Sequence, residues 1–178
     1  MKNRLTFPLL VGLGIALSGT VLMLLLLALG LVGPQAVESD KLMYGGTVLF
    51  ISLYVFILIG LFISLKRRKK QNGDVLTFAE AMKTGLVTSL SAAVFSVLFT
   101  IIFYELIYPS YNPEMTEVIT AKMEALQLST EEIREKVEEQ TKYYSTSVQA
   151  KFSFVGNLIT GLAFSVLISL FLKTRKNA

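Results

Sequence analysis

Long uncharged runs, separated by shorter polar segments, dominate the pattern of the chain. Thirty-three consecutive residues between Arg4 and Glu38 carry no charge, and similar runs cover residues 42–65, 84–104 and 152–172. A helix needs roughly 20 apolar residues to cross the hydrocarbon core of a bilayer, where no backbone polar group can be left unpaired. The pattern therefore predicts an all-α fold, a four-helix transmembrane bundle in one membrane domain. The predicted spans are residues 6–33, 43–65, 82–107 and 152–172.

The first run has an alternative interpretation, a cleaved signal peptide, because Lys2 and Arg4 precede it. The apolar regions of secretory signals span about 7–15 residues. Residues 7–32 form a far longer apolar stretch, and no small-x-small cleavage site follows before Glu38. We therefore expect the first run to remain as a membrane helix.

Basic residues are distributed unevenly between the two sides of this topology. One side carries ten of them, which are Lys2, Arg4, Lys66, Arg67, Arg68, Lys69, Lys70, Lys173, Arg175 and Lys176. The other side carries six, spread over two loops. Because basic residues near helix ends are retained in the cytoplasm, both termini and the loop after Leu65 are predicted to be cytoplasmic. The run from Lys66 to Lys70 is predicted to contact anionic lipid headgroups, and we expect no nucleic-acid partner.

Two capping boxes mark helix starts outside the membrane core. Thr77 with Glu80 predicts a helix that begins at about Phe78, and Ser129 with Glu132 predicts another. No Gly or Pro lies between residues 130 and 152. The second of these helices is therefore predicted to continue without a break into the fourth span.

Residues 109–151 are a solvated insertion between the third and fourth spans. They contain eight Glu against five basic residues, a net charge of −3. Apolar residues recur at helical spacing on both arms, which predicts an extracytoplasmic helical hairpin. Each apolar stripe needs a cover, either the other arm or a second protein. The stripe of the second arm is the candidate partner surface, made of Ile133, Val137, Tyr144 and Val148.

The segment 73–85 resembles a known pattern. It has a Thr-Phe pair, an acidic residue followed by Ala, and a later Gly, which are Thr77-Phe78, Glu80-Ala81 and Gly85. With the aromatic exit of the third span at residues 104–109, it is similar to the bacterial membrane family called domain of unknown function 4199. The resemblance implies a four-pass protein of the cytoplasmic membrane in envelope-bearing bacteria. It supplies no activity and no catalytic residues.

The residue inventory leaves few options for chemistry. The chain has no Cys and no His, which excludes thiolate nucleophiles, Cys/His zinc sites and histidine bases. It is 53% hydrophobic and only 17% charged. No ionisable residue lies deep in a span, so the candidate polar positions are Glu105, at the predicted outer interface, and Asn157, early in the fourth span. We expect no catalytic residue, no cofactor and no resident metal, and carboxylates alone would form at most a weak calcium site.

Small residues follow one face of three spans. Gly12, Gly85 and Gly156 are examples, and close packing between helices is the expected use of all of them. A water path lined by Ser and Thr is the alternative. Two functional hypotheses remain. The first is a non-enzymatic accessory or scaffold protein that meets an envelope protein or a second copy of itself through the acidic hairpin. The second is a small oligomeric channel or transporter that uses Glu105 and Asn157.

Overall fold

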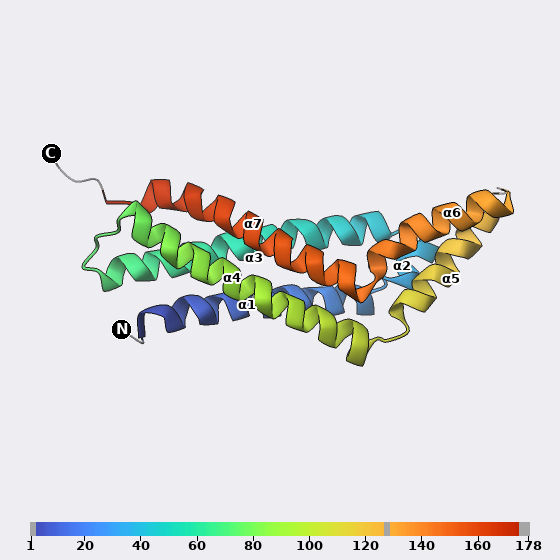
Figure 1. The fold of residues 1–178 in the computed structure, drawn as a ribbon, viewed down its shortest axis with the longest axis horizontal. Coiled ribbons are helices and arrows are strands. Elements are labelled where there is room, and N and C mark those ends of the chain that lie inside the picture. The colour runs from blue at the N-terminus through green and yellow to red at the C-terminus, as the bar shows by residue number, and fades with distance from the viewer. Residues whose placement is uncertain (1–2, 127–128, 175–178) are drawn as a thin grey trace.

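The computed structural model describes residues 3–126 and 129–174, in which all regular secondary structure is helical and no strand is present (Figure 1). The four long helices are α1 (Asn3–Ala28), α3 (Leu42–Gln71), α4 (Phe78–Ile102) and α7 (Thr146–Leu172). Four segments are long and apolar enough to cross a membrane: Leu5–Ala28, Leu42–Gln71, Phe78–Ile107 and Thr146–Leu172. The prediction of an all-α, multi-pass membrane protein is confirmed. Lys2, Arg175 and Lys176 of the predicted basic side lie outside the described residues.

The four helices pack as a bundle whose outer surface is apolar. Helices α4 and α3 each pack against both α1 and α7. Large apolar side chains are exposed on every long helix, among them Leu10, Val21, Phe50, Ile59, Val94 and Ile159. In water such a surface would aggregate, whereas lipid tails solvate it. The start of α1, the end of α3, the start of α4 and the end of α7 lie at one end of the bundle, the α3–α4 end (Figure 1).

The first connection is longer than the sequence predicts. Helix α1 ends at Ala28, five residues before the predicted end of the first span at residue 33. Gly30 and Gly33 take positive φ angles of 65° and 84°, which turn the chain out of the helix. A short helix, α2 (Pro34–Glu38), follows with Pro34 in its first turn, where a missing N–H costs nothing.

Helix α3 runs through the basic segment to Gln71, well past the predicted end of the span at residue 65. Gly73 and Asp74 then reverse the chain with positive φ angles. Helix α4 begins at Phe78, and both hydrogen bonds of the capping box between Thr77 and Glu80 are present. This predicted helix start is confirmed.

Beyond the opposite end of the bundle, the hairpin end, the chain forms two further helices. A π-helical turn, η1 (Phe103–Ile107), ends the third span. Helices α5 (Tyr111–Glu124) and α6 (Thr130–Thr141) then pack against each other in opposite directions (Figure 1). The second capping box, Ser129 with Glu132, begins α6 as predicted.

The prediction of one unbroken helix from the second arm into the fourth span was wrong. A 3-10 turn, η2 (Lys142–Tyr144), and the extended residue Ser145 separate α6 from α7. The turn brings the ring of Tyr144 against Tyr111, with 6.3 Å between their centroids. This packing between distant parts of the chain offsets the helical hydrogen bonds lost at the break, and local sequence carries no sign of it.

Candidate functional site

The half of the bundle at the α3–α4 end, around Gly12, Gly85 and Gly161, is the close-packed half. A Cβ added at Gly12 would lie 2.6 Å from the carbonyl oxygen of Thr88, too close for any real contact. Gly85 and Gly161 leave equally little room, because both face serine side chains of the opposite helix. The predicted use of small residues for close packing holds for Gly12 and Gly85.

Hydroxyl groups in the close-packed half bond to protein atoms. Ser64 on α3 and Thr88 on α4 share a hydrogen bond of 2.9 Å between their hydroxyl oxygens. Ser91 on α4 donates to the carbonyl oxygen of Leu9 on α1 at 2.8 Å. These bonds join helices at positions that the Gly contacts bring together. The hydroxyls of this half therefore act as packing groups.

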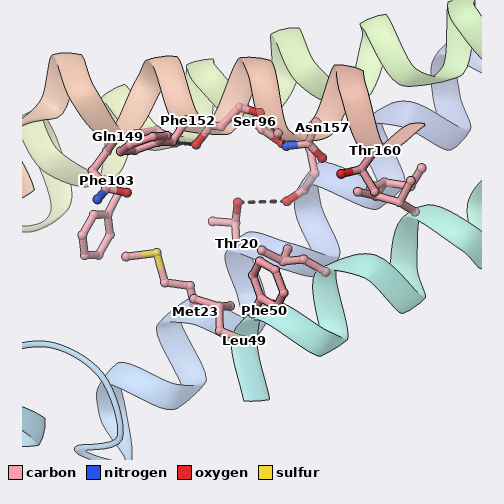
Figure 2. A pocket seen from close by; sticks show the side chains of 18 of the residues that line it. Thr20, Met23, Leu49, Phe50, Ser96, Phe103, Gln149, Phe152, Asn157 and Thr160 are labelled. Carbon is pink, nitrogen blue, oxygen red and sulfur yellow. Dashed lines mark hydrogen bonds between the residues drawn. The ribbon is translucent and has the colours of Figure 1, made fainter. Parts of the chain in front are cut away.

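The half at the hairpin end contains a cavity of about 500 Å³ between α1, α3, α4 and α7, and we call it the cavity half (Figure 2). Hydroxyl and amide side chains contribute to its lining, among them Thr20, Ser96, Thr100, Ser153, Asn157 and Thr160. None of the twenty lining residues carries a charge. In Figure 2, Asn157 of α7 and Thr20 of α1 lie on opposite sides of the pocket.

Asn157 is thus placed on a cavity, as the sequence hypothesis of a polar intramembrane site requires. Its Nδ2 donates to the carbonyl oxygen of Ser153 at 2.7 Å, and its Oδ1 accepts no hydrogen bond from the residues that the structure describes. Thr100 and Ser153 share a hydrogen bond of 2.9 Å nearby. Gly156, which was expected to pack closely, instead borders open space, because an added Cβ would meet no atom within 4 Å.

Glu105 lies elsewhere. It is exposed in η1, and its Oε1 accepts a hydrogen bond of 2.7 Å from the hydroxyl of Thr146, the first residue of α7. Glu105 is not part of the cavity lining. The structure therefore separates the two candidate polar residues and gives Glu105 a contact between the end of the third span and the start of the fourth.

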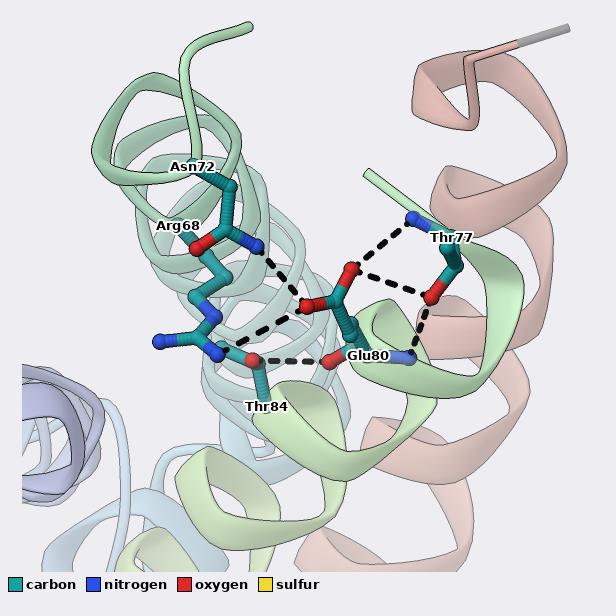
Figure 3. A network of polar contacts seen from close by, with 5 residues as sticks. All are labelled: Arg68, Asn72, Thr77, Glu80 and Thr84. Atoms are coloured by element: carbon teal, nitrogen blue, oxygen red, sulfur yellow. Dashed lines mark hydrogen bonds and ion pairs between the residues drawn. The ribbon is translucent and has the colours of Figure 1, made fainter. Parts of the chain in front are cut away.

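The basic run at the end of α3 divides into inward and outward residues. The side chain of Arg68 is only 15% exposed, and its Nη2 lies 3.8 Å from Glu80 Oε1 (Figure 3). Asn72 Nδ2 donates to the same oxygen at 2.9 Å. The guanidinium of Arg67 lies 3.9 Å from the centroid of the Phe7 ring. Lys66, Lys69 and Lys70, the other three candidate headgroup contacts, have no such partner on another helix within the described part of the chain.

Sequence reasoning missed the role of Arg68, although a signal was present. Leu61 and Leu65 are fully buried, and Arg68 continues their spacing of four and three residues along the same helix face. Glu80 was singled out for capping alone. Its carboxylate accepts from the backbone N and the hydroxyl of Thr77 as well as from Asn72, so one side chain caps α4 and joins it to α3 (Figure 3).

The hairpin is attached to the bundle by an aromatic cluster, which consists of Phe103, Tyr104, Tyr108, Tyr111 and Tyr144. Tyr111, at the start of α5, is only 4% exposed and lies within 5.3–6.3 Å, between ring centroids, of the other four. Burial raises the pKa of both Tyr111 and Tyr144. An ion pair between Lys122 and Asp40 joins α5 to the loop after α2. The hairpin is therefore held by contacts with two other parts of the chain, the aromatic cluster at its base and the loop after α2 near the end of α5.

Much of the candidate partner surface is used within the chain. Val137 and Tyr144 pack against a core that contains Met115 and Ile119, while Ile133 and Val148 are half-buried. The outward face of the hairpin is acidic instead, with exposed carboxylates at Glu117, Glu124, Glu131, Glu132, Glu135, Glu138 and Glu139. Hydrogen bonds from Ser129 lower the pKa of Glu132. No group of three or more acidic residues in the described part of the chain is arranged to hold a metal ion.

Comparison with known proteins places the chain in one family. The model of the family described as Protein of unknown function (DUF4199) matches residues 10–174. No curated protein and no solved structure matches the chain. The chain belongs to this family, and the resemblance noted in its sequence is confirmed. The motif that carried the resemblance has a structural role: Thr77 and Glu80 cap α4, Ala81 is fully buried, and Gly85 faces Ser165.

Proposed function

We propose that this member of the DUF4199 family is a non-enzymatic accessory or scaffold protein of the bacterial cytoplasmic membrane, acting through the acidic α5–α6 hairpin on the extracytoplasmic side. The observation that carries the proposal is the hairpin itself. It is anchored at its base by the aromatic cluster, and its outward face presents exposed carboxylates.

The charge distribution supports this orientation. Lys66 to Lys70 and Lys173 belong to the α3–α4 end, and the hairpin lies beyond the opposite end (Figure 1). Basic residues near helix ends favour the cytoplasm, so the hairpin would face outward from the cell with both termini inside.

The hairpin surface favours a partner with a basic face. Most of its apolar residues pack within the chain, and carboxylates outnumber the exposed basic residues such as Arg134 and Lys136, although Leu126 and Tyr143 are also exposed. Opposite charges across an interface steer association and suppress wrong partners more than they add affinity. We therefore expect binding that weakens as salt is raised.

A second candidate, an oligomeric channel or transporter, is favoured by one observation: Asn157 and several hydroxyls line a cavity in the bundle. The close-packed half stands between this cavity and the α3–α4 end, where Gly12 meets the backbone of α4. A path across the membrane would thus need a second copy or a rearranged bundle.

The test uses the absence of Cys from the sequence. A single Cys in place of Glu135 carries a photo-crosslinker in intact cells, and Met43→Cys, exposed at the start of α3, is the control. We expect a reproducible different protein from the first position and not from the second. Adding Glu138→Lys and Glu139→Lys should remove that product. Crosslinks only between copies of this chain would contradict a different envelope protein as the partner and favour an oligomer, and no crosslink at all would contradict the scaffold.

A further inference from the structure

We propose that the cavity half of the bundle binds an uncharged, membrane-soluble amphiphile, a hydrocarbon tail with a hydroxyl or carbonyl headgroup, which enters sideways from the bilayer. This inference is independent of the hairpin and of its partner. It rests on the size of the cavity, the chemistry of its lining and the position of its opening.

The size of the cavity is that of a ligand site. Small-molecule sites occupy about 300–1,000 Å³, and the cavity measures about 500 Å³. Protein interiors otherwise contain few voids larger than a water molecule. In the same bundle, Gly12 brings α1 and α4 into contact at backbone distance. The same four helices that pack closely in one half of the bundle line a cavity in the other half.

The lining selects the headgroup. It has hydroxyls and amides on three helices, including Thr20, Thr100 and Asn157, and no charged side chain. The Oδ1 of Asn157 accepts no hydrogen bond from the described residues, so it can accept one from a ligand hydroxyl. A phosphate or ammonium group would lie in a membrane interior without a counter-charge, which is costly. A neutral headgroup meets this lining without that cost.

The cavity opens on the outer surface of the bundle, between α3 and α7. Phe50 on α3 and Phe152 on α7 both line the cavity, yet they are 60% and 57% exposed. Side chains that belong both to the cavity wall and to the outer surface mark the place where the cavity meets the bilayer. Gly156 lies four residues after Phe152 on α7, also lines the cavity and has open space in front of it. The route between α3 and α7 therefore suits a molecule already dissolved in the membrane.

The test uses a diacylglycerol whose acyl tail carries a diazirine, added to the full-length protein in lipid nanodiscs. A phosphatidylglycerol with the same tail is the charged counterpart. After illumination, we expect the neutral probe to label residues of the cavity wall and unlabelled dioctanoylglycerol to compete. The charged probe should label only outward-facing residues. Equal labelling of the same outward-facing residues by both probes would show bulk lipid contact only and would overturn the proposal.

A matched pair of variants tests the location. Gly156→Leu places a side chain in the mouth of the cavity, and we expect labelling of the cavity wall to fall at least about tenfold. Gly14→Leu makes the same change at another exposed glycine with open space, outside the cavity, and should leave labelling unchanged.

A second variant, Asn157→Leu, replaces the amide by an apolar side chain of similar size. It should reduce the preference for the neutral probe over the charged one. Two results would overturn the proposal. One is that folded Gly156→Leu is labelled at the cavity wall as strongly as the unmodified chain. The other is that folded Asn157→Leu keeps the same preference for the neutral probe. Thermal unfolding in the same nanodiscs establishes that each variant is folded.

Discussion

Two glycines in different halves of the bundle, Gly12 and Gly156, have opposite surroundings. In the close-packed half, Gly12 and Gly85 let neighbouring helices approach until an added Cβ would meet other atoms at impossible distances. In the cavity half, Gly156 faces open space, and a cavity of about 500 Å³ separates the same four helices. A glycine in a membrane helix can therefore bring two backbones together or leave room for something else.

The difference has a physical basis. Lipid tails are as apolar as leucine, so hydrophobic burial does little to hold membrane helices together, and van der Waals contact and hydrogen bonds must do so. The close-packed half provides both, through Gly12 and through the Ser64–Thr88 hydrogen bond. Because these contacts hold the helices together, the same helices can remain separated around the cavity in the other half. The hairpin and its aromatic cluster close the bundle beyond that cavity.

The largest loss of stability is expected when a larger side chain is introduced into the close-packed half. Gly12→Leu forces a side chain against Ser91, the carbonyl oxygen of Thr88 and the backbone N of Ala92. Backbone atoms cannot rotate away, so we expect a loss of about 3 kcal/mol or more, enough to lower the yield of folded protein. Thermal unfolding of the purified protein in detergent measures the loss.

Gly14→Leu is the control for this prediction, because the same substitution two residues away meets open space. It should unfold within a few degrees of the unmodified chain. If Gly12→Leu and Gly14→Leu unfolded alike, the close contact between Gly12 and α4 would contribute nothing to stability.

The second prediction compares the two capping boxes. Glu80 caps α4 and also meets Arg68 and Asn72 of α3, whereas Glu132 caps α6 and bonds to Ser129. Glu80→Ala should cost about 0.3–1.5 kcal/mol for its part in the capping box, and more because it leaves the little-exposed Arg68 without its partner. Glu132→Ala should cost less.

Thermal unfolding ranks the two variants, and hydrogen exchange locates the damage. Exchange should rise in α4 and in the end of α3 for Glu80→Ala, but only in α6 for Glu132→Ala. Equal losses with exchange confined to the capped helix in both variants would show that the contact with Arg68 contributes nothing.

The smallest expected effect concerns the base of the hairpin, where the hydroxyl of Tyr108 donates to Glu114. Hydrogen bonds from Ser110 and Tyr108 lower the pKa of Glu114, and the bond to Glu114, together with burial, raises the pKa of Tyr108 to about 12. The contribution of Tyr108 to the free energy of unfolding is complete below its ordinary pKa of 10.0 and is lost as pH rises through about 12. The contribution of Glu114 to the free energy of unfolding is complete above its ordinary pKa of 4.5 and is lost as pH falls below that value.

Spectrophotometric titration of tyrosine checks this prediction. In Glu114→Gln, one tyrosine should titrate nearer pH 10 than in the unmodified chain, and Tyr108→Phe should remove that titration. Hydrogen exchange at the start of α5 should rise slightly at both pH extremes. A titration curve identical in Glu114→Gln and the unmodified chain would contradict the assigned bond.

Several features could be predicted from sequence because their causes are local. Four uncharged runs require four membrane helices, and the capping boxes at Thr77 and Ser129 place two helix starts where the structure has them. Other features depended on distant contacts. The break at residues 142–145 follows from the packing of Tyr144, and the inward turn of Arg68 from the position of Glu80.

By itself, the sequence determined the number of spans, the family and the acidic character of the hairpin, because hydropathy, motif spacing and charge are properties of the chain alone. Only the tertiary structure decided which small residues meet. Gly12 and Gly156 look alike in sequence, yet one is packed against backbone and the other borders a cavity. Helix periodicity places a residue on a face, whereas the distance to the next helix depends on every other contact in the bundle.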